Sequence, residues 1–429
     1  MALNLSTLTS PATSGDVLAE IELKADNLDL VPVLRNLGQG ASNATQDTAL
    51  NQPVAHVPVN GGHLYLSGVS GNYASVLDAT ELDITGDIDL RVFSGNWQVD
   101  GSRKFIVAKQ GGATTRSYGL ELGIDGTLML PLSFDGSAAN HYISTASVPF
   151  TTGDSGWVRV VRNQSTGDVS FFTSATSTPS WSPLGSVVAG STSAIFANAI
   201  RMTFGATNNG DFGHSVLSLG KIQIYASTDG TDKRLDIDFS KAPHAATTFT
   251  PTVGGTVTIN QSGNDPATIV RRPFLRFDGV NSTMSGLFDS TITGGTFFIV
   301  ARGRVGSTSG YYFYTSKSGE PVVIWRYTNI NGTLRSYYQG GNKLLHSATN
   351  SGIGHLVTHT KLTDVGEASL NGQFLTDATN PAVNSQTYNI SHSSGYLAAD
   401  IEHMSFFPVG SRINPRVMLN YLNEKYPAS

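Results

Sequence analysis

The chain has 429 residues, which is too long for one ordinary hydrophobic core and fits two domains of about 200 residues each. The formal net charge is −5 and only 14% of residues are charged, with no Lys or Arg cluster, so nothing favours a nucleic-acid partner. The chain lacks cysteine, which excludes disulfides, thiolate metal sites and cysteine nucleophiles, and its 46 glycines favour an all-β protein rich in tight turns.

Residues 1–16 are rich in Ser, Thr and Pro and are predicted to form an extended N-terminal arm. The first residues lack a charged start followed by an apolar stretch, and no segment approaches about 18 consecutive apolar residues. The sequence therefore predicts neither a signal peptide nor a membrane span. We expect synthesis in a cytoplasm, with any exterior position reached by other means.

From residue 63 onward, alternation of apolar and polar residues predicts half-buried strands. Residues 87–92 read Asp, Ile, Asp, Leu, Arg, Val, and residues 119–124 alternate in the same way. Asp125-Gly126 follows the second of these strands and is typical of a hairpin turn. Residues 240–255, with two prolines and paired glycines, predict a linker or a crossover between domains.

The second half of the chain repeats short anchors of the first half in the same order. Leu66-Ser67-Gly68-Val69, Val76-Leu77-Asp78-Ala79 and Ile84-Thr85-Gly86 recur as Phe277-Asp278-Gly279-Val280, Leu287-Phe288-Asp289-Ser290 and Ile292-Thr293-Gly294. An apolar segment follows each copy, at 88–93 and 297–301. We therefore predict two related β-rich modules in tandem, 17–245 and 246–429.

One helix is predicted at the end of the second module. Asn414 can cap it, Pro415 suits the first turn, and apolar residues spaced four apart continue until Pro427. We expect this helix to pack across the second module or against a neighbouring subunit.

A series of short segments in the first module recurs in a familiar order. It includes Leu82 to Val92, Ala108-Lys109, Arg116 to Leu120, Asp125 to Leu128, Trp157 to Val160, Gly167 to Ser174, Trp181 and Leu184-Gly185. The series resembles the laminin G-like, concanavalin A-like modules of minor tail and other virion proteins of tailed bacteriophages. The resemblance covers about residues 27 to 260, while the second module resembles a generic concanavalin A-like domain. It implies an all-β protein with two jelly-roll sandwiches in tandem.

The resemblance also implies a place on the virion surface. The first interpretation is a minor tail or tail-tip structural protein that adheres to the host surface, with a host glycan, other virion proteins and further copies of the chain as partners. A capsid decoration or head-fibre protein anchored by the N-terminal arm is the alternative within this class. A polysaccharide depolymerase and a bacterial lectin are the alternatives from other classes. The sequence does not separate head from tail, nor does it fix the ligand, the host or the copy number.

Enzymatic chemistry has little support in the sequence. Asp236 and Asp238 lie on one face of a predicted strand and could form an acid–base pair, but the spacing is also that of ordinary surface aspartates. His355 and His359 are four apart and could ligate a metal, although the matching stretch of the first module has no such residues. We predict no enzyme and no cofactor. Calcium at a sandwich rim is compatible with the resemblance, and no residues are assigned to it.

Carbohydrate binding requires exposed aromatic rings beside polar partners. The aromatic residues in Gly-, Asn- and Ser-rich surroundings are the candidates, namely Trp97, Tyr142, Trp325, Tyr337 and Tyr338. For each of them, burial or a subunit contact is the competing explanation. Trp157 and Trp181 are predicted to fill the core of the first sandwich.

Overall fold

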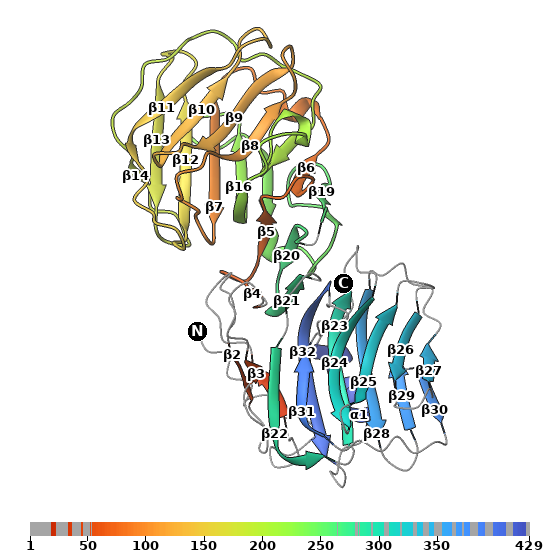
Figure 1. Ribbon diagram of the computed structural model, residues 1–429. Coiled ribbons are helices and arrows are strands. Elements are labelled where there is room, and N and C mark those ends of the chain that lie inside the picture. Colours follow the sequence, from red (N-terminus) through yellow and green to blue (C-terminus); the bar gives the residue numbers. More distant parts are fainter. Residues whose placement is uncertain are drawn as a thin grey trace. The chain divides into compact units, whose positions relative to one another are not determined.

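A computed structural model describes the chain at the following residues, and every structural statement below refers to them (Figure 1): 19–22, 33–36, 44–45, 52, 54–263, 265–278, 282, 284–292, 295–303, 309–317, 320–328, 333–337, 343–346, 354–362, 366–370, 373–377, 385–390, 398–408 and 415–425. The chain divides into two compact units. The continuous unit is Pro58–Arg272, and the split unit combines Met1–Val57 with Pro273–Ser429. No helix of the described residues is long and apolar enough to cross a membrane.

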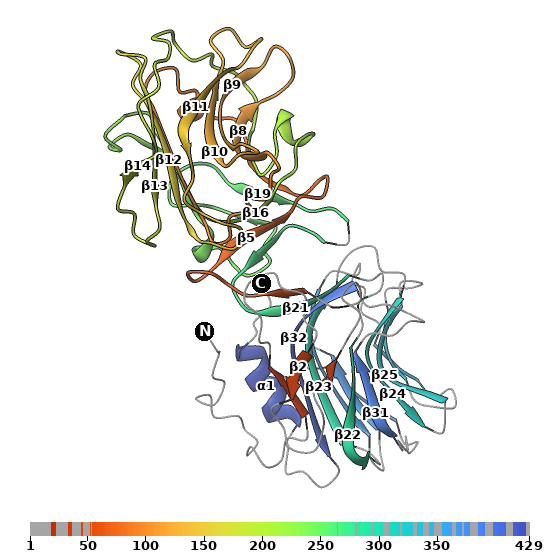
Figure 2. The same ribbon diagram turned by 60° about the vertical axis from the view of Figure 1, so that its left-hand side comes forward.

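The continuous unit is a sandwich of two antiparallel sheets (Figures 1 and 2). The β7 sheet has the order β14-β13-β12-β7-β16-β5-β20, with β17 paired to β16. Its strands are β5 (His63–Ser67), β7 (Ile88–Ser94), β12 (Gly156–Arg162), β13 (Val169–Ser174), β14 (Ser182–Pro183), β16 (Val216–Tyr225), β17 (Lys233–Asp238) and β20 (Thr268–Val270).

The second layer, the β8 sheet, has the order β11-β10-β9-β8-β15-β6-β19-β18. Its strands are β6 (Tyr73–Val76), β8 (Lys104–Gln110), β9 (Arg116–Leu122), β10 (Thr127–Leu132), β11 (Asn140–Ser147), β15 (Met202–Phe204), β18 (Thr248–Phe249) and β19 (Val257–Asn260). Short 3-10 helices lie at η3 (Thr80–Leu82), η4 (Asn208–Gly210) and η5 (Phe239–Lys241).

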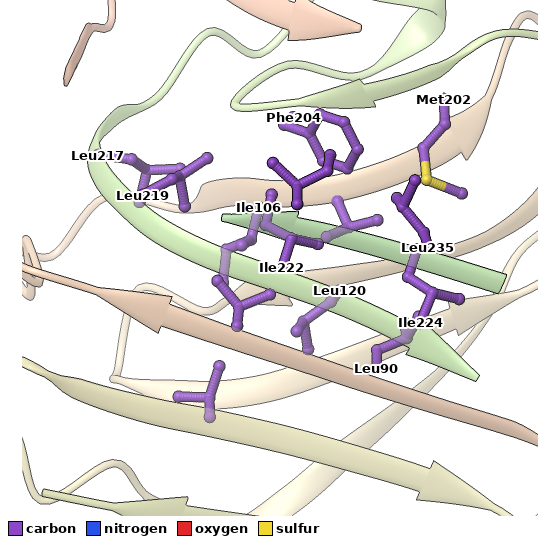
Figure 3. Packing of buried hydrophobic residues seen from close by; sticks show 14 of the residues in the cluster. Leu90, Ile106, Leu120, Met202, Phe204, Leu217, Leu219, Ile222, Ile224 and Leu235 are labelled. Atoms are coloured by element: carbon purple, nitrogen blue, oxygen red, sulfur yellow. The ribbon is translucent and has the colours of Figure 1, made fainter. Parts of the chain in front are cut away.

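The core of the continuous unit lies between its two sheets. The strand predicted at residues 87–92 is present as β7, and Leu90 and its apolar neighbours face the core. The predicted half-burial is wrong, because Asp89 on the opposite face is fully buried as well. Figure 3 shows Leu90, Ile222 and Ile224 of the β7 sheet with Ile106, Leu120 and Phe204 of the β8 sheet in this layer. Burial of each such side chain stabilises the fold by about 1.5–3 kcal/mol.

The continuous unit extends further along the sequence than the predicted range 17–245. Strands β18 and β19 extend the β8 sheet beside β6, and β20 pairs with β5 in the β7 sheet. The predicted linker at 240–255 therefore includes η5 and β18, and the chain leaves this unit after Arg272. Residues 19–56 carry strands of the split unit instead of the first module.

The split unit contains two layers connected where β1 pairs with β2. One layer is β27-β26-β25-β24-β31-β22-β3-β2, and the other is β1-β32-β23-β28-β29-β30, in which β21 also pairs with β32 and β4 pairs with β21. The strands of the first layer are β2 (Val33–Asn36), β3 (Ala44–Thr45), β22 (Met284–Ile292), β24 (Ser309–Lys317), β25 (Glu320–Thr328), β26 (Thr333–Tyr337), β27 (Lys343–His346) and β31 (Ser385–Ile390). Those of the second are β1 (Ala19–Glu22), β4 (Val54–His56), β21 (Phe274–Asp278), β23 (Gly295–Gly303), β28 (Gly354–Leu362), β29 (Gly366–Leu370), β30 (Gln373–Asp377) and β32 (Ala398–Pro408).

The predicted terminal helix is confirmed as α1 (Pro415–Lys425). It packs on β23 and β28 of the split unit through the buried side chains of Met418, Leu419 and Leu422. Arg276 of β21 and Asp400 of β32 form a buried bidentate ion pair directly across the sheet. Because the two units are both all-β antiparallel sandwiches, the predicted tandem of jelly-roll modules is confirmed.

Candidate functional site

Two of the predicted sugar-stacking residues lie in the continuous unit. Trp97 has no exposed surface, its Nε1 donates to the Gly156 carbonyl at 3.0 Å, and its ring stacks on Phe150. The prediction that Trp97 stacks on a sugar is therefore wrong, because the indole is fully buried within the core. Tyr142 lies directly opposite Leu130 and packs half-buried against the core, and its part in carbohydrate binding stays a prediction.

The other three candidates belong to the split unit. The structure describes the backbone of Trp325 in β25 and of Tyr337 in β26, while Tyr338 lies outside the described residues. Nothing in the described residues tests the side-chain contacts of these three. Their part in carbohydrate binding stays a prediction.

Trp157 and Trp181 do not fill the core as predicted. In β12, Val158 and Val160 point into the core, so Trp157 and Arg159 point to the opposite, outer face of the β7 sheet. Trp157 is buried there, and Trp181, half-buried on the loop before β14, packs edge-on against it at 6.1 Å between ring centroids. The sequence pattern did not distinguish burial between the sheets from burial on an outer face.

The outer face of the β7 sheet carries polar and aromatic side chains in aligned rows. One row crosses the sheet through directly opposed residues, namely Asp236, Gln223, Arg91, Arg159, Phe172 and Pro183. In the neighbouring rows, Tyr225 opposes Asp89 and Phe93 opposes Trp157. We call Asp89, Arg91, Arg159, Phe172, Trp181 and Tyr225 the arginine–aromatic face.

A buried carboxylate holds the two arginines of this face together. Two arginines directly opposite each other in a sheet repel. Asp89 has no exposed side-chain surface and accepts from Nη2 of Arg91 at 2.6 Å and from Nη2 of Arg159 at 2.8 Å. The Nε atoms of both arginines also donate to Asp89. The cluster therefore keeps one net positive charge, with both guanidinium groups fixed in orientation.

Aromatic rings surround the two guanidinium groups. The Cζ of Arg91 lies 4.4 Å from the Tyr225 ring centroid and 5.9 Å from that of Trp181. The Cζ of Arg159 lies 5.5 Å from the Trp181 centroid and 5.2 Å from that of Phe172. Each such contact stabilises the pair by about 0.5–2 kcal/mol, depending on desolvation. Trp181 is thus a half-buried ring that lies near both arginines.

The loop between β16 and β17 completes the arginine–aromatic face. The Thr228 carbonyl accepts from Nη2 of Arg159 at 3.1 Å. Gly230 has a φ of +76° and approaches Arg91 so closely that a Cβ there would lie 2.3 Å from Nη2. The Nη1 groups of both arginines have no hydrogen-bond partner among the described residues, and their side chains are 16% and 14% exposed. These N–H groups can donate to an external acceptor.

Asp236 and Asp238, the suggested acid–base pair, each form an ion pair with a lysine. Lys233 Nζ donates to Asp236 at 2.7 Å, and Lys221 Nζ lies 3.5 Å from Asp238. Burial alone would raise the pKa of Asp238, but hydrogen bonds from Ser240 and the charge of Lys221 outweigh it and hold this pKa below its ordinary value. A general acid of a glycosidase needs a raised pKa, so this pair is a structural ion-pair cluster.

The loop aspartates of the continuous unit accept hydrogen bonds from residues of their own turns. Asp135 accepts from the backbone N–H and the hydroxyl of Ser137, and Asp154 does the same with Thr151. Backbone hydrogen bonds lower the pKa of each carboxyl. Among the described residues, no group of three or more His, Asp or Glu side chains could hold a metal ion.

A second, smaller surface feature lies on the β8 sheet. The Phe212 ring is 64% exposed and lies edge-on to Phe105, which Arg103 covers at 5.0 Å. Arg103 also pairs with the buried Glu121, whose pKa burial raises and the arginine partly restores. In the β8 sheet one arginine pairs with one carboxylate, whereas in the arginine–aromatic face two arginines share one.

Comparisons with known proteins identify no family for this chain. No family model matches the sequence. No curated protein sequence matches it either.

Solved structures share features of the architecture at low similarity. Domains LG4–5 of the mouse laminin α1 chain match with 13% identity and a TM-score of 0.31, over 81% of this chain and 88% of that one. A putative carbohydrate-binding protein from Bacteroides ovatus matches with 8% identity and a TM-score of 0.34, over 49% of this chain and 62% of that one. The binding domain of botulinum neurotoxin DC, in complex with rat synaptotagmin II, matches with 10% identity and a TM-score of 0.27, over 93% and 100%. TM-scores this low identify no relative, and the fold rests on the strand order and register described above.

Proposed function

We propose that this chain is a non-enzymatic adhesion protein whose continuous unit binds an acidic surface glycan on the arginine–aromatic face. The observation that carries the proposal is the placement of the half-buried Trp181 ring near two oriented guanidinium groups. An aromatic ring stacks on the apolar face of a sugar, and arginine N–H groups pair with a carboxylate or with hydroxyls. The net charge of the Asp89 cluster favours an anionic sugar over a neutral one.

Within this proposal, the protein acts on the surface of a bacteriophage particle as a minor tail or tail-tip structural protein. The support is the resemblance of residues 27 to 260 to virion modules, and a capsid decoration protein is the alternative on the same support. Its further partners would be other virion proteins and more copies of the chain. Many copies on one particle give avidity, so a single-site Kd of about 1 mM, equivalent to about −4 kcal/mol, suffices for adhesion.

A depolymerase is disfavoured by the chemistry of the described carboxylates. Asp236 and Asp238 are paired with lysines, and Glu121 is paired with Arg103. A retaining glycosidase requires two carboxyl groups about 5–5.5 Å apart that face one sugar, one of them with a raised pKa. Asp78 and Asp83 also lie close together, but both pair with the buried ammonium group of Lys109. The proposal is therefore binding without turnover.

The test compares two aromatic variants of the full chain. Oligosaccharides with a terminal uronic acid, and their neutral counterparts, are titrated by calorimetry against the wild type, Trp181→Ala and Phe212→Ala. We expect Trp181→Ala to weaken binding of the acidic sugar about tenfold, equivalent to about 1.4 kcal/mol, because stacking and an arginine contact are lost. Phe212→Ala removes a more exposed ring on the loop after η4, which packs on Phe105 of β8, and should leave binding unchanged.

Equal affinity for acidic and neutral sugars would contradict the role of the arginines. Loss of binding in Phe212→Ala with retention in Trp181→Ala would move the site to the β8 sheet. Release of shortened sugars during the titration would replace adhesion by hydrolysis as the function.

A further inference from the structure

The two units have the same strand order, position by position. The β7 sheet runs β14-β13-β12-β7-β16-β5-β20, and the corresponding layer of the split unit runs β30-β29-β28-β23-β32-β21-β4. The β8 sheet runs β11-β10-β9-β8-β15-β6-β19-β18, and its counterpart runs β27-β26-β25-β24-β31-β22-β3-β2. Strands β5 to β16 thus correspond in order to β21 to β32, and we call these two sets body 1 and body 2.

The remaining strands are exchanged between the two bodies. In the continuous unit, β17 to β20 complete body 1, although they follow it in the sequence and precede body 2. In the split unit, β1 to β4 complete body 2, although they lie at the start of the chain. We call β1–β4, residues 19–56, opening segment 1, and β17–β20, residues 233–270, opening segment 2.

The two opening segments share a short sequence pattern. Glu20-Ile21-Glu22-Leu23 in the first corresponds to Asp236-Ile237-Asp238-Phe239 in the second. The strands that they contain pair alike, since β1 lies beside β32 as β17 lies beside β16. Each sequence repeat therefore consists of an opening segment followed by a body, and each body is completed by the opening segment of the other repeat.

Opening segment 1 contributes to both layers of the split unit. Glu20 opposes Ser405 in one layer, and Thr45 opposes Ser285 in the other. Strand β4 pairs with β21, where the His56 ring is 1% exposed and stacks on Phe274 at 4.7 Å between centroids. Without this segment, body 2 lacks partners along β21, β22 and β32, and unpaired sheet edges bind further strands.

We propose that opening segment 1 can complete body 2 of a second copy of this chain, so that copies join head to tail through residues 19–56. Body 1 is completed by the opening segment of the repeat that follows it. By the same rule, body 2 of one copy can be completed by the first repeat of a second copy. In that case opening segment 1 of the second copy pairs with body 2 of the first. The contacts are identical within and between chains, so concentration decides between the two closures.

The hinge of this exchange is the passage from β4 to β5. The chain leaves the split unit at Val57 and enters the continuous unit at Pro58. A residue before proline is restricted to extended backbone, which disfavours a tight reversal at this point. The exchange depends on strand pairing alone and holds whether or not the arginine–aromatic face binds a glycan.

The test uses the natural absence of cysteine in the full-length chain. Ala55 of β4 and Leu275 of β21 are directly opposed, and such pairs lie within the Cα separation that a disulfide spans. The single variants Ala55→Cys and Leu275→Cys are mixed, unfolded, refolded together and oxidised, and the products are separated without reductant. A disulfide that links the two variants forms only between chains. We expect this linked product.

The double variant Ala55→Cys/Leu275→Cys measures the balance between the two closures. Closure within a chain is independent of concentration and closure between chains is bimolecular, so a tenfold rise in protein concentration should raise the ratio of linked to unlinked chains about tenfold. The pair Glu20→Cys and Ser405→Cys, on β1 and β32, repeats the measurement without a change to a buried apolar residue. Ala55→Cys mixed with Ser102→Cys, an exposed loop position, is the control that should not link above background.

Three results would overturn the proposal. One is oxidation of both double variants within single chains only, at every concentration. Another is failure of both double variants to form any disulfide, which would mean that opening segment 1 does not pair with body 2. Cross-linking of the Ser102→Cys control to the same extent would likewise show that linkage reflects random collision.

Discussion

Replacement of Asp89 by Asn tests the arrangement of the arginine–aromatic face. The carboxylate has no exposed surface and accepts hydrogen bonds from the Nε and Nη2 atoms of both Arg91 and Arg159. Removal of one partner from a buried ion pair costs about 3–5 kcal/mol. The two guanidinium groups are partly exposed and recover some solvation, which places the expected loss near the lower end, at about 3 kcal/mol.

The assay is urea unfolding of the full chain, followed by the fluorescence of its tryptophans. Asp89→Asn should lower the midpoint of the transition of the continuous unit with little change in slope, because the surface exposed on unfolding stays the same. Asp168→Asn removes an exposed loop carboxylate whose side chain makes no bond within the described residues, and it should cost less than about 0.5 kcal/mol. Equal losses in the two variants would refute the view that Asp89 organises the two arginines.

Three further predictions concern the continuous unit. Gly230→Ala and Gly101→Ala impose similar backbone strain, because the φ angles of these glycines are +76° and +77°. Only Gly230→Ala places a Cβ against Arg91, so only this variant should weaken acidic-sugar binding in the calorimetric titration. Lys109→Met removes a fully buried ammonium bonded to Asp78 and to two backbone carbonyls, and it should cost about 3 kcal/mol in urea unfolding, against almost nothing for the exposed control Lys241→Met. Burial lowers the pKa of His63 from 6.5 to about 4, so only the unfolded chain takes up this proton between those values. The contribution of neutral His63 to the free energy of unfolding should be fully present above about pH 6.5, and the free energy of unfolding should fall by about 3 kcal/mol by about pH 4. In urea unfolding measured as a function of pH, His63→Gln should reduce this dependence of the free energy of unfolding on pH.

Much of the fold could be predicted from local pattern. Alternation at residues 87–92 indicated both the strand and the polar face that carries Asp89 and Arg91, because strand side chains alternate between the two faces of a sheet. The repeated anchors indicated two sandwiches, and helix capping with apolar spacing indicated α1. These features depend on residues close together in the sequence.

The site could be predicted only in part, because burial depends on distant contacts. Trp97 stands among small polar residues, as exposed rings often do, yet the Gly156 carbonyl and Phe150 enclose it. Trp181 acquires its position from Trp157 and Arg159 on β12 and from Arg91 on β7. No local pattern reports which residues become opposed across a sheet.

The exchange of opening segments could not be predicted from sequence for a similar reason. Two copies of a segment are equally compatible with two copies of a body, so pattern and propensity do not decide which pairs with which. The predicted boundary at 245/246 followed the proline- and glycine-containing stretch at 240–255, whereas the compact units follow the pairing of β17–β20 with body 1.

The most direct test of adhesion through the arginine–aromatic face is the indole N–H region of a nitrogen-15 NMR spectrum during titration with an acidic oligosaccharide. The chain has four tryptophans, and a Trp→Phe variant of each assigns the four signals. We predict that the Trp181 signal shifts progressively with added sugar while the signal of the buried Trp97 does not move. A spectrum in which Trp181 stays fixed while another tryptophan shifts, or in which none moves at millimolar sugar, would contradict this account.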